Sequence, residues 1–311
     1  MASLAGDDVS TKLQLRLERL NELAGVVAST AQLIQGTVAA TRPDGSPPGT
    51  ATRAKLCAQL VDDLISHEIL DGWSVVRRAA ELGCDLTMGA LVLCVEPHTP
   101  RPRFVTSLIA DDCADALVRV VEDAGTPPRL RVYAVLPATG ASVAGSIGAV
   151  RRLTERIAPY GAVGVSSFQA QAAELGRALR EAELMVDVVR NCDAPLAEEV
   201  GSGTYRLLLR MLASHPDDVR GLYETTVRPI VRYDWEHCTD LVATLRAYLA
   251  SNGNLNATAA AVLAHRHTIS ARLDRIRALT CLDPLRYEDR ERLGLGLKAY
   301  RLLSPQLADG A

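Results

Sequence analysis

The stretch from Asn254 to Leu282 constrains the fold of this chain more than any other, because it encodes two short helices around a tight turn. Asn256 is a suitable N-cap for an alanine-rich first helix over residues 257–263. A turn at Ala264-His265 follows, and the pattern then predicts a second helix over residues 266–279.

The second helix has an apolar face and a polar face. Its apolar residues are spaced four and three apart, which predicts one inward stripe of Ile269, Leu273 and Ile276. The opposite face is polar or small and is flanked by arginines: Arg266, His267, Ser270, Ala271 and Asp274, with Arg272, Arg275 and Arg277. A basic helical pair suits the DNA major groove. An ordinary helical hairpin with solvated arginines has the same periodicity, so periodicity alone leaves both interpretations open.

Residues 265–276 read HRHTISARLDRI. This run resembles the signature helix of PucR/CdaR-type bacterial transcription regulators, which typically reads His-Arg-Asn-Thr-Leu-x-Tyr-Arg-Leu-x-x-Ile. Asp234 with residues 240–249, and residues 279–283 with 289–303, resemble the flanking helices of that family. The resemblance covers residues 205–303 and implies a DNA-binding transcriptional regulator.

Two residues depart from the family pattern. His267 stands where the family usually has Asn, and Ala271 stands where it usually has Tyr. Both lie on the predicted outward face, so we expect an unusual base preference. The fold expectation is unaffected because the inward stripe is intact.

The residues expected to face DNA fall into three groups. Phosphate contacts are expected from the backbone amides that open the second helix and from Thr258, Arg272 and Arg275. Base contacts are expected from the exposed front, where Ala271 would meet a thymine methyl: Arg266, His267, Ser270 and Ala271. The turn and the start of the second helix are expected to be stabilised by His265 and Thr268, with phosphate contact as the alternative.

Charge and composition limit how such a chain can bind nucleic acid. The 311 residues are 48% hydrophobic and 23% charged, which is typical of a globular protein of about two domains. The chain has 34 Lys and Arg against 37 Asp and Glu, a formal net charge of −3. DNA affinity must therefore come from a local basic patch, which argues against non-specific coating.

The cysteines and termini predict a cytoplasmic protein. The seven cysteines are scattered without a Cys-x-x-Cys pair, so neither a disulfide framework nor a zinc site is indicated. No signal peptide precedes the helices, and no apolar run reaches membrane-spanning length. We therefore expect no membrane partner, no metal and no cofactor.

The N-terminal part predicts self-association. Apolar residues recur at alternating spacings of four and three over residues 13–38, which indicates a heptad seam and favours a parallel homodimer. The alternative is a helix packed on its own domain, given Gly25 and Gly36 within the pattern. A Pro/Gly linker follows at 41–50, and helices are expected over 51–69 and 73–82.

Residues 87–192 read as a mixed module. Apolar runs predict strands at 88–95, 130–136 and 162–166, alternating with helices at 111–124, 142–157 and 169–190: one sheet with helices packed on it. This order, with residues 163–166 and 179–183, resembles the degenerate GGDEF-like domain found ahead of the helix-turn-helix in many PucR/CdaR-type proteins.

The sequence predicts that this module has no catalytic residues. A diguanylate cyclase needs an acidic Gly-Gly-Asp/Glu-Glu-Phe hairpin for magnesium, and residues 125–129 read GTPPR instead. Residues 140–146 mimic a phosphate loop but carry Ser146 where lysine is required, so they are interpreted as a helix start. A nucleotide-dependent enzyme therefore has no support.

The expected protein is multidomain and mainly α, with a central α/β (α+β) module. Its expected parts are an N-terminal helix (1–40), a linker (41–50), a helical segment (51–86), a GGDEF-like domain (87–192) and a helix-turn-helix domain (200–304). Expected partners are operator DNA, a second copy of the chain and a small-molecule effector. The alternative is a regulator of the same architecture that senses an effector or binds protein without reading DNA.

Overall fold

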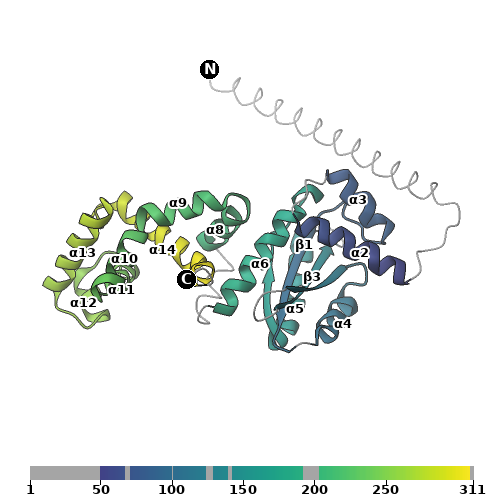
Figure 1. Cartoon of the computed structure of the whole chain (residues 1–311), viewed down its shortest axis with the longest axis horizontal. Helices are drawn as coiled ribbons and strands as arrows, with labels where there is room; N and C mark the ends of the chain where they lie inside the picture. The colour runs from purple at the N-terminus through teal and green to yellow at the C-terminus, as the bar shows by residue number, and fades with distance from the viewer. Residues whose placement is uncertain are drawn as a thin grey trace, which may run out of the picture.

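The computed structural model describes residues 50–66, 71–99, 101–123, 129–138, 142–191 and 203–308. The predicted dimerisation helix over 13–38 and almost all of the Pro/Gly linker lie outside these residues. Figure 1 shows an α/β lobe and an all-helical lobe that meet at α6 and α8. The expected fold class, mainly α with a central α/β module, is confirmed.

The centre of the α/β lobe is a four-stranded antiparallel sheet in the order β2-β3-β1-β4. The strands are β1 (Ala90–Pro97), β2 (Leu117–Asp123), β3 (Arg129–Pro137) and β4 (Gly161–Val165). Strands β1 and β3 are apolar over long runs because helices cover both faces of the sheet.

Edge strand β2 corrects the sequence prediction of a helix over residues 111–124. Helix α4 (Pro102–Asp112) ends where that helix was expected to begin, and Leu117–Asp123 pairs with β3 instead. The segment contains Val118, Val120 and Val121, whose branched side chains suit a pleated surface. The choice between helix and strand is decided by pairing with β3, a contact that the local periodicity of the sequence does not reveal.

Helices cover the two faces of the sheet. One face packs against α2 (Thr50–Ile65), α3 (Gly72–Glu81) and α6 (Leu175–Asn191), and the other against α4 and α5 (Val143–Ile157). Two short 3-10 helices, at Ala158–Tyr160 and Ala172–Glu174, precede β4 and α6 respectively. The sheet is therefore a fully covered core rather than an open surface.

Several predicted helix ends are confirmed by their capping contacts. The Ser142 hydroxyl accepts a hydrogen bond from the Gly145 amide at 3.1 Å, so Ser142 is the N-cap of helix α5, and residues 140 and 141 lie outside the described residues. Gly83 has a φ of +80° just past α3, as expected of a C-terminal glycine. The long helix predicted from residue 169 begins instead at Leu175, because a bridge between Gln169 and Ala90 keeps the preceding segment extended.

The helical lobe contains seven described helices around one core. They are α8 (Gly203–Ser214), α9 (Pro216–Thr226), α10 (Arg228–His237), α11 (Leu241–Ala250), α12 (Leu255–Ala261), α13 (Arg266–Thr280) and α14 (Tyr287–Ala308). Helix α14 returns along α9, where the rings of Tyr223 and Tyr300 stack with centroids 5.5 Å apart. None of the described helices is long and apolar enough to cross a membrane.

Helix α6 belongs to both cores. Its residues Ala178, Leu179 and Ala182 pack under the sheet, while Leu184 and Met185 pack with the helical lobe. The sequence placed a domain boundary directly after this helix, at residues 192–200, which are outside the described residues. Because α6 contributes side chains to both hydrophobic cores, it connects the two lobes directly.

Candidate nucleic-acid interface

The first helix of the predicted pair begins two residues earlier than the sequence indicated. The side-chain oxygen of Asn254 accepts hydrogen bonds from the backbone amides of Asn256 (3.0 Å) and Ala257 (3.1 Å), so Asn254 rather than Asn256 is the N-cap. Helix α12 ends at Ala261, and Leu263 adopts a left-handed φ of +51° with its side chain 95% exposed. The correction shifts the whole first helix toward the N-terminus.

The second helix starts where predicted, and His265 is its N-cap. The His265 Nδ1 atom accepts a hydrogen bond from the His267 amide at 3.3 Å, and the two imidazole rings stack with centroids 5.2 Å apart. The predicted inward stripe is confirmed, since Ile269 and Ile276 are fully buried and Leu273 nearly so. This anchoring fixes which face of α13 points outward.

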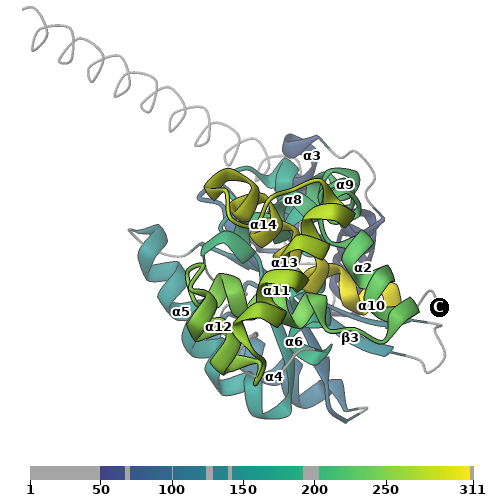
Figure 2. The ribbon, with the colours of Figure 1, turned by 90° about the vertical axis from the view of Figure 1, so that its left-hand side faces the viewer.

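The outward face of α13 is open to solvent. Arg266, His267, Thr268, Ala271 and Arg275 are exposed, and Ser270 is half-buried. Figure 2 shows that α11, α12 and α13 lie together at the end of the helical lobe that is remote from the sheet. None of the residues expected to contact bases is enclosed by the rest of the described structure.

Two residues that the sequence assigned to phosphate contact have other contacts. Thr258 is fully buried and its hydroxyl donates to the Asn254 carbonyl at 2.7 Å, so its surface contact was wrongly expected. The Arg272 guanidinium donates to the Thr244 hydroxyl of α11 at 2.9 Å and lies 4.0 Å from the Asp240 carboxylate. Arg272 therefore braces α13 against α11.

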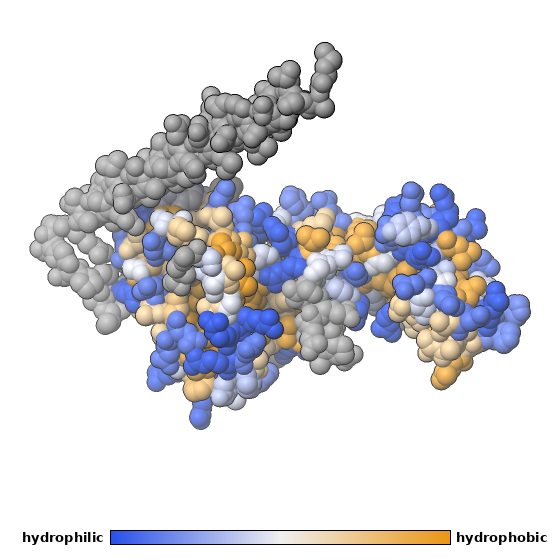
Figure 3. Space-filling view, turned by 180° about the vertical axis from the view of Figure 1, so that it is seen from behind, coloured by the Kyte–Doolittle hydropathy of each residue, from blue (hydrophilic) through white to orange (hydrophobic). Residues whose placement is uncertain are grey.

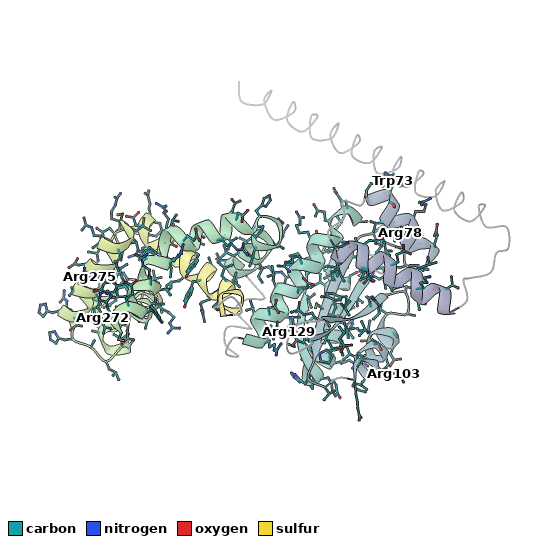
Figure 4. All side chains as sticks on the ribbon, in the orientation of Figure 1. Trp73, Arg78, Arg103, Arg129, Arg272 and Arg275 are labelled. Atoms are coloured by element: carbon teal, nitrogen blue, oxygen red, sulfur yellow. The ribbon has the colours of Figure 1, made fainter. Side chains whose placement is uncertain are left out.

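The other arginines of α13 differ in how they are held. Arg275 lies over the Tyr233 ring of α10, 5.3 Å from its centroid, and Arg277 pairs with Asp283 at 3.4 Å. Arg266 forms no ion pair with any other described residue. Figure 4 shows Arg272 and Arg275 close together on the helical lobe. Arg266 and Arg275 are thus the cations of this face that lack an acidic partner in the described part of the chain.

Asp234 is a supporting residue whose role sequence reasoning missed. Its carboxylate accepts hydrogen bonds from the amides of Leu241 and Val242, both at 2.8 Å, and from the Thr239 hydroxyl at 2.6 Å. Asp240, the residue just before α11, makes no such capping bond. Asp234 of α10 therefore fixes the start of α11, the helix against which Arg272 is braced. Local sequence patterns did not reveal this role, because Asp234 lies seven residues before Leu241, whose amide it caps.

Two possible sources of chemistry in the described part of the α/β lobe are metal-ligand clusters and the thiols of its buried cysteines Cys57 and Cys84. No group of three or more His, Cys, Asp or Glu residues between 50 and 308 is placed to hold a metal, as far as those residues are described. Burial raises the pKa of the Cys84 thiol to about 12, and it also raises the pKa of Cys57. These thiols are held in their neutral form and behave as core side chains.

The two lobes match two family models. Residues 241–299 match the PucR C-terminal helix-turn-helix domain, and residues 66–188 match a GGDEF-like domain. This chain is a PucR/CdaR-type transcription regulator. In this regulator the GGDEF-like match starts at residue 66 and so includes α3, which packs on the sheet core. The helix-turn-helix match includes every residue from α11 to the middle of α14.

A solved structure aligns with most of this chain. The crystal structure of a regulator of polyketide synthase expression from Bifidobacterium adolescentis is 17% identical, with a TM-score of 0.38. The alignment covers 80% of this chain and 98% of that chain. No curated protein matches the sequence.

Proposed function

We infer that this regulator binds double-stranded DNA sequence-specifically, with α13 in the major groove. The observation that carries this inference is the division of α13 into two faces. Ile269, Leu273 and Ile276 are buried, while Arg266 and His267, in the first turn, are exposed. A helix anchored from behind with an open cationic front has the geometry required for base contact.

The side chains of α13 suggest a division of roles. Arg266, His267, Ser270 and Ala271 are proposed to face base edges, with Arg266 donating two hydrogen bonds to a guanine. Arg275, with the exposed Thr268 and the amides that open α13, is proposed to contact phosphate, and His265 holds that opening turn in place. Arg272 positions the helix through α11, and Thr258 acts only inside α12.

Electrostatics supports a local interface. The whole chain has a net charge of −3, so DNA is not attracted to the molecule as a whole. Helix α13 concentrates four arginines against the single acidic residue Asp274. Binding through this face should therefore weaken steeply with added salt, because each neutralised phosphate releases counterions.

Dimerisation would complete the interface. One α13 contacts only a few base pairs, and a second copy would supply a second half-site about one helical turn away. The heptad pattern over residues 13–38 is the segment proposed to bring the two copies together. An inverted repeat in the bound DNA is the expected signature.

The test is electrophoretic mobility shift of the full chain on DNA upstream of its own gene, across a salt series, against random DNA of equal length. Preferential binding to a defined site, protected in footprinting, is the expected result. Equal affinity for both DNAs, or no binding with the fold intact, would contradict the proposal. Binding of a protein partner through α13 would instead support the alternative regulator that does not read DNA.

A further inference from the structure

The turn between α12 and α13 carries the most exposed large apolar side chain in the described part of the chain. Leu263 is 95% exposed, and its backbone adopts a left-handed φ of +51°. The left-handed conformation is unfavourable for a residue with a Cβ atom, and full exposure leaves the side chain without the gain from burial. Its neighbours Val262 and Ala264 pack against the helical core, so Leu263 alone of the three is directed outward.

The backbone hydrogen bonds of this turn explain the conformation but not the residue. The Ala264 amide donates to the Ala259 carbonyl at 2.9 Å, and the Leu263 amide donates to the Ala260 carbonyl at 3.4 Å. This pair of bonds is a Schellman motif, in which the left-handed residue after the helix is usually glycine. Ala259 and Ala264, the positions that meet in this motif, both pack against the core. The fold therefore gives no reason for leucine in place of glycine.

Leu263 lies beside the residues proposed to contact DNA. His265 caps α13 two residues later, its ring stacks on that of His267, and Arg266 between them is exposed. In helix-turn-helix docking, the second helix enters the major groove by its first turn while the first helix crosses the phosphate backbone. The turn between the two helices then meets the major groove, where thymine displays its C5-methyl group.

We propose that Leu263 contacts the C5-methyl group of a thymine next to the base pairs that face the start of α13. This inference rests on the proposed DNA binding and adds a specificity-determining residue to it. The methyl group is read by apolar contact, which a leucine supplies and a glycine does not. On binding, the side chain gains the burial that it lacks in the free protein, which offsets the cost of its backbone conformation.

A second copy of the chain is the alternative occupant of an exposed leucine, and charge favours DNA. No acidic residue occurs from Asn254 to Leu273, whereas Arg266 and Arg272 lie within that stretch. A symmetric contact between two copies through Leu263 would bring the Arg266 side chains of both copies near each other. Phosphate groups on either side of a thymine are complementary to the same surroundings.

The test replaces thymine by deoxyuridine, which differs only in lacking the C5-methyl group. A duplex that the full chain selects from random DNA is resynthesised with each thymine replaced in turn, and fluorescence anisotropy measures the affinity. At one thymine, loss of the methyl group should weaken binding by the wild-type chain about threefold to fivefold. Leu263→Gly should weaken binding to the thymine duplex by at least that factor and should not distinguish thymine from deoxyuridine at that position.

Three further measurements separate this contact from a structural role. Leu285→Gly removes another exposed leucine, in the turn before α14, and should leave the methyl effect unchanged. Leu263→Gly should unfold at a urea concentration no lower than the wild-type chain, because glycine suits the left-handed position. Leu263→Asn, which also tolerates that conformation, should repeat the DNA result. A lower urea midpoint in Leu263→Gly would overturn the proposal, since the side chain would then support the fold.

Failure of this contact is distinguishable from failure of DNA binding. A wild-type chain that selects a site but is indifferent to every deoxyuridine, or a methyl effect that persists at every position in Leu263→Gly, overturns the proposal and leaves DNA binding standing. A wild-type chain that selects no sequence contradicts the proposed function, and this inference fails with it. Loss of self-association in Leu263→Gly, measured by analytical ultracentrifugation without DNA, would assign the leucine to a contact between copies and overturn the proposal.

Discussion

At the scale of single residues, arginines on one helix have different tasks because their neighbours differ. Arg266 and Arg272 are six positions apart on α13, yet Arg266 points to solvent and Arg272 donates to Thr244. The same contrast separates the buried Thr258 from the exposed Asn256 and Ala257 that directly precede it in α12. Residue type alone does not distinguish a DNA contact from an internal brace.

Replacing Arg266 by alanine should reduce affinity for the cognate site by about 1–3 kcal/mol and relax specificity at one base pair. Arg277→Ala removes the same charge from the last turn of α13, where the side chain pairs with Asp283, and should have a smaller effect. Fluorescence anisotropy with the cognate site and its single-base variants measures both. An equal loss on cognate and random DNA would show that Arg266 contacts phosphate instead.

Cysteine reactivity should follow burial. Cys238 and Cys281 are exposed, whereas Cys84 and Cys94 are buried with pKa values raised by desolvation. A raised pKa lowers the thiolate fraction at pH 8, so the buried pair should react slowly. Mass spectrometry after brief iodoacetamide treatment should find label at Cys238 and Cys281 first. Early labelling of Cys94 in the folded chain would contradict this core.

At the scale of elements, the helix-turn-helix depends on a cap that another helix supplies. Helix α11 is fixed by Asp234 of α10 rather than by the adjacent Asp240, and α13 is braced on α11. Figure 3 shows apolar surface at the tip of the helical lobe. Leu263, in the turn after α12, is 95% exposed. Helices α12 and α13 are therefore anchored through α11, and the turn between them is exposed to solvent. The proposed insertion into a DNA groove requires such an exposed surface.

Asp234→Ala should lower the free energy of unfolding by about 1–2 kcal/mol, the typical effect of losing a helix cap. Asp240→Ala is the matched control, because Asp240 sits directly before α11 without a capping bond. Urea denaturation followed by circular dichroism measures both variants. If Asp240→Ala were the more destabilising change, the cap would not be where the hydrogen bonds indicate.

At the scale of the whole molecule, one buried ion pair ties the lobes together. The Glu181 carboxylate of α6 is almost completely buried, accepts from the Ser167 amide and hydroxyl, and pairs with Arg206 of α8 at 3.0 Å. Desolvation lowers the pKa of Arg206, and the Glu181 charge opposes that shift. The pair joins the loop after β4, the shared helix and the first helix of the DNA-binding lobe.

Arg206→Ala should destabilise the chain by about 3 kcal/mol, because it leaves the Glu181 charge buried without its cation. Arg210→Ala, one turn later on α8 and exposed, should have little effect. Urea unfolding transitions of the two variants give the comparison. A change below 1 kcal/mol in Arg206→Ala would mean that Glu181 does not need this partner.

The sequence by itself determined the elements whose patterns are local. The four-and-three stripe of α13 and the cap of α5 at Ser142 depend on neighbours within one or two turns, so they could be read from order alone. The apolar strands β1 and β3 were located in the same way, with ends that shifted by one or two residues. The tertiary structure alone decided β2, the burial of Thr258, the cap at Asp234 and the sharing of α6. Each of these depends on a partner distant in the chain, and hydrogen bonding or burial against such a partner outweighs local propensity.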